Sequence, residues 1–343
     1  MKSNNIEERS WTILSTIVES YIHTAEPVGS RTLSKLLDVN LSPATIRNIM
    51  ADLTEQGLLD QPYTSAGRIP TSQAYRYYVN AIKVPVELPL EKKQIIEEAI
   101  LGPITSLDGV LEATTKLLAE LTDYTGMVTA PRFNDTELRQ IEFIRVNELQ
   151  VFAVLITQSS MVHTKLLEVS ENLTQDFLNS VGRYLTEHFA QKSLKEIRRQ
   201  VQESLVEDKE QYDQLLAHAV RLSKKAFEFS EERALYVEGH FNILRAIADI
   251  NTAQRLLKIL EEKLVVLELL DGALTTEGVQ IRIGEENPDT NFQDFSVITA
   301  NYGNGPITLG SIGVIGPTRM DYGAVIPVIE YTAKTLSQAI AKN

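Results

Sequence analysis

A short stretch that begins at Ser42 combines the residue types that read bases in duplex DNA. Arginine can donate two hydrogen bonds to guanine, asparagine can bond adenine, and threonine can contact a thymine methyl group. Thr45, Arg47 and Asn48 supply these groups within about one helical turn. Ser42 is a good N-cap residue, and the backbone N–H groups at a helix start suit a phosphate. We therefore predict that these four residues contact DNA.

The apolar residues that alternate with this polar set predict the helix that positions it. Pro43 suits the first helical position, where its missing N–H costs nothing. Apolar residues then recur at helical spacing through Ile46, Ile49, Met50 and Leu53. This spacing predicts one buried face and an exposed polar set near the helix start, as a helix that enters the major groove requires. An ordinary surface helix with a good cap is the alternative for this segment alone.

A hairpin is predicted directly after this helix, with strands near 58–60 and 68–70. Its loop and second strand carry Tyr63, Ser65 and Arg68. A wing would place such side chains along the DNA backbone or in the minor groove, where arginine is favoured. A purely structural hairpin with incidental polar residues is the alternative.

The order of elements in the first part of the chain is that of a winged helix-turn-helix. An apolar stripe over 6–21 predicts a first helix, Ser30 caps a second, and the helix described above is the third. The hairpin follows, and a tyrosine-rich helix over 72–83 closes the unit. A proline-punctuated segment at 84–90 predicts a linker, so residues 1–83 form the predicted DNA-binding domain.

The remaining chain predicts an α+β multidomain protein in which a helical segment interrupts a sheet. Strand patterns occur at 126–130, 141–146, 151–157 and 161–167, and again at 279–283, 296–300 and 307–315. The first group predicts an antiparallel meander, and a last helix is predicted at 321–341. We assign 91–190 and 271–343 to one domain and 191–270 to a mainly helical insertion, although two separate domains would give a similar pattern.

Charge is distributed unevenly along the chain. Residues 1–83 carry 8 Lys/Arg and 8 Asp/Glu, so the net charge of −13 falls on 84–343. Phosphate repels an acidic body, which would orient a neutral head toward DNA. Solubility alone is an equally good explanation of this acidity.

Composition argues against an enzyme, a metalloprotein and a membrane protein. The 343 residues include no cysteine, and the five histidines form neither a close pair nor an HExxH motif. The glycine-rich segment 310–316 matches no phosphate-binding fingerprint, and a strand that crosses close to another backbone explains it better. No apolar run is long enough to span a membrane, and the first residues lack a signal-peptide core. We therefore expect a cytoplasmic protein without a metal or cofactor.

Several motifs together resemble those of the heat-inducible transcription repressor family HrcA. The N-terminal motifs are Pro27-Val28-Gly29-Ser30-Arg31, Ser42-Pro43-Ala44-Thr45-Ile46-Arg47-Asn48, Ser65-Ala66-Gly67-Arg68-Ile69-Pro70-Thr71 and Tyr75-Arg76-Tyr77-Tyr78. The C-terminal motif is Gly313-Val314-Ile315-Gly316-Pro317-Thr318-Arg319-Met320-Asp321-Tyr322. A generic winged helix would not carry the C-terminal motif, so the resemblance spans the whole chain.

The resemblance implies a fold and a function beyond what the residues themselves indicate. Family members have a winged helix, a GAF-like α/β domain and an inserted dimerisation domain, which agrees with the interrupted sheet pattern. They repress chaperone operons by binding an inverted-repeat operator, CIRCE, as homodimers, and they lose the operator on heat stress. The resemblance also implies a second partner besides double-stranded DNA, the GroE chaperonin, which keeps the repressor active.

Two other functions compete with this interpretation. One is a one-component transcription regulator controlled by a small ligand in its GAF-like domain. The other is an enzyme with a DNA-binding head, for which the sequence offers no catalytic constellation. Near the C-terminal motif, we expect Arg319 and Asp321 to pair and to cap the last helix, with ligand binding as the alternative.

Overall fold

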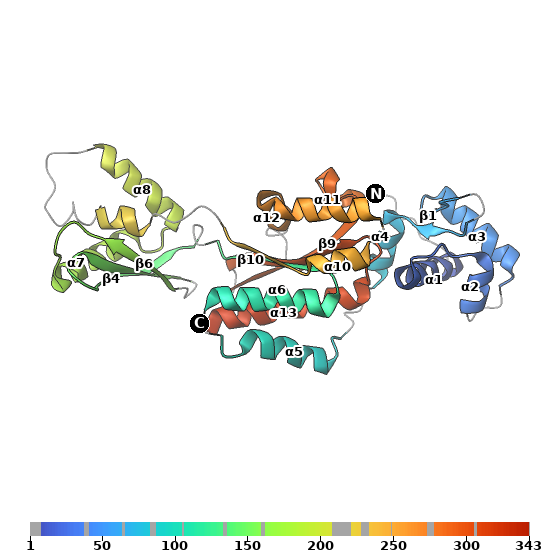
Figure 1. Cartoon of the computed structure of the whole chain (residues 1–343), viewed down its shortest axis with the longest axis horizontal. Helices are drawn as coiled ribbons and strands as arrows, with labels where there is room; N and C mark the ends of the chain where they lie inside the picture. Colours follow the sequence, from blue (N-terminus) through green and yellow to red (C-terminus); the bar gives the residue numbers. More distant parts are fainter. Residues whose placement is uncertain are drawn as a thin grey trace.

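The chain forms three parts arranged along one long axis in the computed structural model (Figure 1). The structure describes residues 8–37, 41–63, 66–82, 87–104, 106–132, 136–158, 162–207, 221–227, 233–247, 249–272, 278–304 and 307–342. We call residues 8–82 the head, residues 136–227 the inserted unit, and residues 87–132 with 233–342 the body. The head and the inserted unit lie at opposite ends of the body.

The head is a winged helix-turn-helix, in the predicted order of elements. Its elements are α1 (Glu8–Thr24), α2 (Ser30–Leu36), α3 (Pro43–Glu55), β1 (Leu59–Asp60), β2 (Ile69–Pro70) and α4 (Ser72–Ala81). The two short strands pair antiparallel, with Leu59 opposite Pro70. Apolar residues from all four helices are buried in one core, among them Ile13, Leu33, Ile46 and Tyr75.

The body is a five-stranded antiparallel sheet covered by helices on both faces (Figure 1). Its strands, in spatial order, are β7 (Leu235–Glu238), β3 (Thr125–Thr129), β10 (Ile307–Pro317), β9 (Phe295–Asn304) and β8 (Val279–Ile283). Its helices are α5 (Leu90–Leu101), α6 (Leu107–Thr122), α10 (His240–Ala246), α11 (Ile250–Glu261), α12 (Lys263–Asp271) and α13 (Tyr322–Lys342). Two short 3-10 turns, η2 (Gly284–Glu286) and η3 (Thr290–Phe292), connect β8 to β9.

Alternate residues of the central strands enter two different cores. Ile312 and Val314 of β10 pack in the core that contains α6 and α13. Ile315 of the same strand and Met127 of β3 pack with α11 and α12. Because successive side chains of a strand point to opposite faces, both faces of this sheet are buried. The five residues of β3 are accordingly all buried.

The inserted unit has a separate three-stranded antiparallel sheet, in the order β4-β5-β6. Its elements are β4 (Leu138–Arg145), β5 (Gln150–Thr157), β6 (Val162–Glu168), α7 (Gln175–Phe189) and α8 (Leu194–Glu207), and residues 221–226 are also helical. One face of the sheet packs with these helices in a core of its own. The other face exposes Ile144, Phe152 and Leu166, which lie opposite one another in the strand register.

This division of the chain differs from the predicted ranges. Strand β3 pairs with β10 and β7 instead of β4, so the meander comprises β4 to β6 only. Strand β7 lies in the stretch predicted as helical, and the apolar faces of α11 and α12 belong to a core of the body. The separate unit is therefore 136–227 rather than 191–270. A helical pattern shows which face of a helix is apolar, but it does not show which sheet that face will cover.

Candidate nucleic-acid interface

Helix α3 begins with the predicted cap. The Ser42 Oγ accepts a hydrogen bond from the Thr45 backbone N–H at 3.1 Å. The same oxygen lies 2.9 Å from the Thr45 Oγ1, so the two hydroxyls also bond each other. Pro43 occupies the first turn, where the backbone has no need of its N–H. The cap fixes the start of the helix and holds both hydroxyls at its exposed end.

Helix α3 exposes the polar residues that the sequence nominates for reading DNA. Its apolar face is anchored in the head by Ile46, Met50 and Leu53, which are buried, and by Ile49, which is half-buried. Thr45, Arg47 and Asn48 are all exposed. Figure 1 shows α3 on the side of the head that faces away from the body, so the body does not cover this surface. The geometry fits a helix that can enter a major groove.

The hairpin after α3 presents Tyr63 at its tip. This side chain is 75% exposed, and the loop is closed by hydrogen bonds from the Ala66 N–H to the Tyr63 carbonyl and from the Gln61 amide to the Ala66 carbonyl. The second candidate on this loop, Ser65, lies outside the described residues. An exposed aromatic side chain on a closed loop is suited to contact with a sugar–phosphate backbone.

Arg68 lies at the base of the wing and holds it against α3. Its Nε donates to the Thr54 Oγ1 at 3.0 Å, and the side chain is half-buried. Its backbone N–H and carbonyl each bond Val28 at 2.9 Å. Arg68 therefore positions the wing, and any contact that it makes with DNA, as predicted, must leave these bonds in place.

Gly67 allows the wing to approach the turn between α1 and α2. A Cβ atom at this position would lie 2.5 Å from the carbonyl carbon and oxygen of Val28. Two motifs far apart in the sequence, around Val28 and around Gly67, thus meet at one contact. Sequence reasoning missed Val28 and Thr54 as partners of the wing. Val28 is an apolar residue in the short segment between α1 and α2, and this was the available signal for its role.

The tyrosines of α4 pack within the protein rather than toward DNA. Tyr75 is buried, and Tyr77 and Tyr78 are half-buried. Tyr78 donates a hydrogen bond to the Glu19 carboxylate at 3.4 Å. Burial, followed by the negative charges of Glu19 and Asp321, raises the pKa of Tyr78 to about 12. These side chains therefore fix α4 in place.

Arg319 and Asp321 have separate roles. The Asp321 carboxylate accepts from the Ala324 N–H and so caps α13, as expected. Arg319 donates instead to two backbone carbonyls, those of Ile22 at the end of α1 and Ala246 at the end of α10. The arginine of the C-terminal motif therefore reaches the head.

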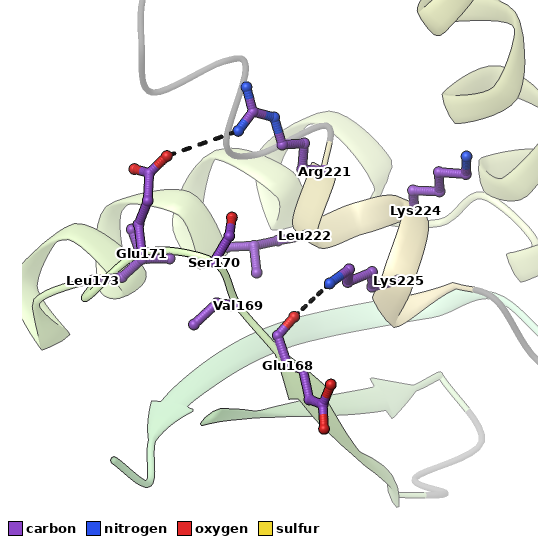
Figure 2. A pocket seen from close by; sticks show the side chains of 9 residues that line it. All are labelled: Glu168, Val169, Ser170, Glu171, Leu173, Arg221, Leu222, Lys224 and Lys225. Carbon is purple, nitrogen blue, oxygen red and sulfur yellow. Dashed lines mark hydrogen bonds and ion pairs between the residues drawn. The ribbon is translucent and has the colours of Figure 1, made fainter. Parts of the chain in front are cut away.

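A pocket of about 220 Å³ lies in the inserted unit, where β6 ends (Figure 2). Its basic side chains come from the 221–226 helix, and its acidic ones are Glu168 at the end of β6 and Glu171 in the segment after it. Arg221 lies 4.0 Å from the Glu171 carboxylate, and Lys225 donates to the Glu168 carbonyl. This pocket is remote from α3 and from the central sheet, where the small-ligand alternative would place an effector.

The part of the chain that the structure describes holds no group of three His, Cys, Asp or Glu side chains placed to bind a metal ion. In the same ranges, no helix is both long and apolar enough to cross a membrane.

Comparison with known proteins matches two segments of the chain to one family. A model of the winged helix-turn-helix transcription repressor HrcA DNA-binding domain matches residues 5–83, and a model of the HrcA protein C-terminal domain matches residues 108–326. The heat-inducible transcription repressor HrcA of Geobacter sulfurreducens is 39% identical over 338 residues, which cover 98% of each chain. That of Syntrophobacter fumaroxidans is 38% identical, again over 98% of each chain.

A solved structure agrees with the fold over the same extent. A crystal structure described as that of a hypothetical protein superposes with a TM-score of 0.63 and 24% identity, over 98% of each chain. The residues matched by this structure, by the two family models and by the relatives include the head, the body and the inserted unit. The chain therefore belongs to the family of heat-inducible transcription repressors HrcA.

Proposed function

We propose that this chain is a cytoplasmic homodimeric repressor of chaperone operons, which binds an inverted-repeat CIRCE operator and releases it on heating. The observation that carries DNA reading is the capped helix α3, which buries its apolar face and exposes Thr45, Arg47 and Asn48. Membership of the HrcA family supports the choice of operator and of regulated operons. In this proposal Arg47 and Asn48 contact base edges, while Ser42 and the helix start contact phosphate.

The exposed sheet face of the inserted unit supports a homodimer. Ile144, Phe152 and Leu166 form one row across the three strands, and Phe152 is 40% exposed. Val162 extends this apolar surface along β6. Contiguous exposed apolar surface marks interaction sites in soluble proteins. A dimer with two-fold symmetry presents two heads related in the same way as the half-sites of an inverted repeat.

Heat release requires only that the binding-competent fold be marginally stable. Folded domains are held by about 5–15 kcal/mol, so a modest rise in temperature can remove a large part of the active population. The GroE chaperonin would then return unfolded chains to the active form. Support for this partner comes from the family resemblance alone.

The test is binding of the purified dimer to an inverted-repeat duplex selected from a random library. Fluorescence anisotropy at physiological salt should give an affinity at least about 1,000-fold above that for random DNA. The bound fraction should fall steeply on heating and recover faster when chaperonin and ATP are present. Equal affinity for the repeat and for random DNA would reject operator recognition, and recovery unaffected by chaperonin would reject that partner.

A further inference from the structure

A set of contacts that DNA reading does not require fixes the head to the body; we call this set the joint. Its head residues are Ile22, Ser72, Tyr75 and Arg76, and its body residues are Ala246, Ile281, Gly284, Glu286, Arg319 and Tyr322. Figure 1 shows α4, which supplies most of the head residues, between the rest of the head and the central sheet. The joint therefore lies on the opposite side of the head from α3.

The first contact of the joint is a two-pronged ion pair. The Arg76 Nε donates to one oxygen of the Glu286 carboxylate at 2.7 Å, and its Nη2 donates to the other oxygen. Nη2 also donates to the Ile281 carbonyl at 2.6 Å. Two parallel hydrogen bonds between arginine and a carboxylate fix an orientation as well as a distance. Arg76 thereby sets the angle of α4 relative to the end of β8.

The second contact joins two helix ends through one side chain. Arg319 donates to the Ile22 carbonyl in the last turn of α1 at 3.4 Å and to the Ala246 carbonyl at the end of α10 at 2.8 Å. The last carbonyls of a helix lack partners within the helix, and a cation is favoured there. One arginine of the body therefore holds the head at α1, a different helix from the one that Arg76 fixes.

The third contact is close packing between the start of α4 and the turn after β8. Gly284 has a φ of +57, and a Cβ there would lie 2.3 Å from the Ser72 Oγ at the start of α4. Tyr75 packs against Tyr322 of the body with their ring centroids 5.9 Å apart, and both side chains are buried. The apolar core of the head continues through this pair into the body.

We propose that the joint sets the direction in which α3 faces and thereby determines which spacing between operator half-sites the dimer accepts. Arg76, Glu286 and Arg319 are in this view positioning residues, which act on specificity without touching DNA. The inference rests on the proposed function, because it requires a dimer that binds two half-sites.

The need for such a joint follows from the geometry of DNA. Each added base pair moves a half-site by about 3.4 Å and rotates it by about 35° around the helix axis. Two heads on a rigid frame can engage only one such arrangement, whereas loosely attached heads can follow several. Contacts on both α1 and α4 restrain rotation of the head as well as translation, since a single point of attachment would leave rotation free.

The first experiment measures affinity against operator spacing with the full-length chain. The duplexes carry the selected half-sites at their natural spacing, at spacings changed by one and two base pairs, and a single half-site alone. The wild-type chain should lose at least about 100-fold in affinity when two base pairs are inserted, because the gain from simultaneous engagement is lost. The double variant Arg319→Ala/Glu286→Gln should lose less than about 10-fold, with single half-site affinity unchanged.

A matched control separates the joint from general effects of losing a charge. Glu120→Gln removes one partner of the exposed Lys116–Glu120 pair on α6, which is 3.8 Å apart and outside the joint. This variant should keep the wild-type spacing preference. A spacing preference of the double variant equal to that of wild type would overturn the proposal. So would a parallel loss of single half-site affinity, because the contacts would then support the head's own fold.

A second measurement tests, in the absence of DNA, how rigidly the joint holds the head on the body. The chain contains no cysteine, so Asp52→Cys on α3 and Lys258→Cys on α11 create unique sites for nitroxide labels on two exposed positions. In dimers diluted with unlabelled chain, the label-to-label distance distribution should be narrow and should broaden in the double variant. Equal widths would overturn the proposal. A wild-type chain with a narrow distribution but no preference for any spacing would contradict the proposed function instead, and the spacing rule with it.

Discussion

The contact between the wing and the α1–α2 turn predicts that Gly67→Ala will destabilise the head. The added Cβ would lie 2.5 Å from the carbonyl carbon and oxygen of Val28 and 2.8 Å from the carbonyl carbon of Pro27. These are backbone atoms, which cannot rotate aside as a flexible side chain would. The wing must therefore move away from the turn.

The size of the effect follows from the bonds that this movement breaks. Val28 and Arg68 exchange two backbone hydrogen bonds of 2.9 Å each. Each such bond contributes about 0.5–1.5 kcal/mol, so the loss should be about 1–3 kcal/mol. For a unit the size of the head, this corresponds to a fall in melting temperature of about 5–20 °C. The displaced wing should also weaken operator binding.

Trp11 and Gly29 provide the assay and its control. Trp11 is the single tryptophan of the chain and lies half-buried in α1, so its fluorescence reports unfolding of the head. Gly29 belongs to the same turn as Val28, but a Cβ there would meet nothing within 4 Å, and its backbone is extended. Gly29→Ala should therefore change stability by less than about 1 kcal/mol. Equal melting temperatures for the two variants would refute the proposed steric cause.

Three further outcomes follow from the joint and the inserted unit. Tyr75 is 2% exposed, and its buried hydroxyl has no hydrogen-bond partner among the described residues. Replacing it by phenylalanine removes this unsatisfied group, so Tyr75→Phe should stabilise the chain by up to about 1 kcal/mol. A lower melting temperature for this variant would contradict the prediction. Burial tends to raise the pKa of Glu286, but hydrogen bonds from Arg76 and the Ile283 N–H outweigh it and lower the pKa below the ordinary 4.5. Stabilisation by Glu286 should thus be present above pH 4.5 and be lost as the pH falls through the lowered value, and the melting difference between wild type and Glu286→Gln should shrink in acid; a constant difference would argue against it. Phe152→Asp should raise the dimer dissociation constant at least about 10-fold, because it places a charge in an apolar interface. Analytical ultracentrifugation would measure this change, and the affinity for a single half-site should stay the same. An unchanged dissociation constant would exclude this sheet face as the dimer interface.

The sequence was sufficient to predict most of the local structure of the head, although Gly29 and not Ser30 is the N-cap of α2. The cap at Ser42 and the spacing of Ile46, Met50 and Leu53 are local signals, and a helix start depends mainly on residues within one turn. The exposure of Arg47 and Asn48 follows from the same spacing. These predictions succeed because each rests on neighbours in the sequence.

Longer-range pairings were beyond the sequence patterns. Strand β3 has no alternation because both of its faces are buried, and nothing in residues 125–129 indicates that their partners lie in β7 and β10. The role of Arg319 depends on two carbonyls contributed by α1 and α10, which carry no side-chain signal at all. Arg68 was predicted at the wing, but its bond to Thr54 depends on how the hairpin folds back on α3.

The most direct test of base reading by α3 is the affinity of Arg47→Ala for the selected operator and for versions with single base-pair substitutions. At fixed salt, the variant should lose about 1–3 kcal/mol on the selected operator, and its discrimination should disappear at one base pair in each half-site. All other positions should keep their specificity. A uniform loss across every duplex, random DNA included, would assign Arg47 to phosphate, and an unchanged affinity would contradict the account of α3 as the reading helix.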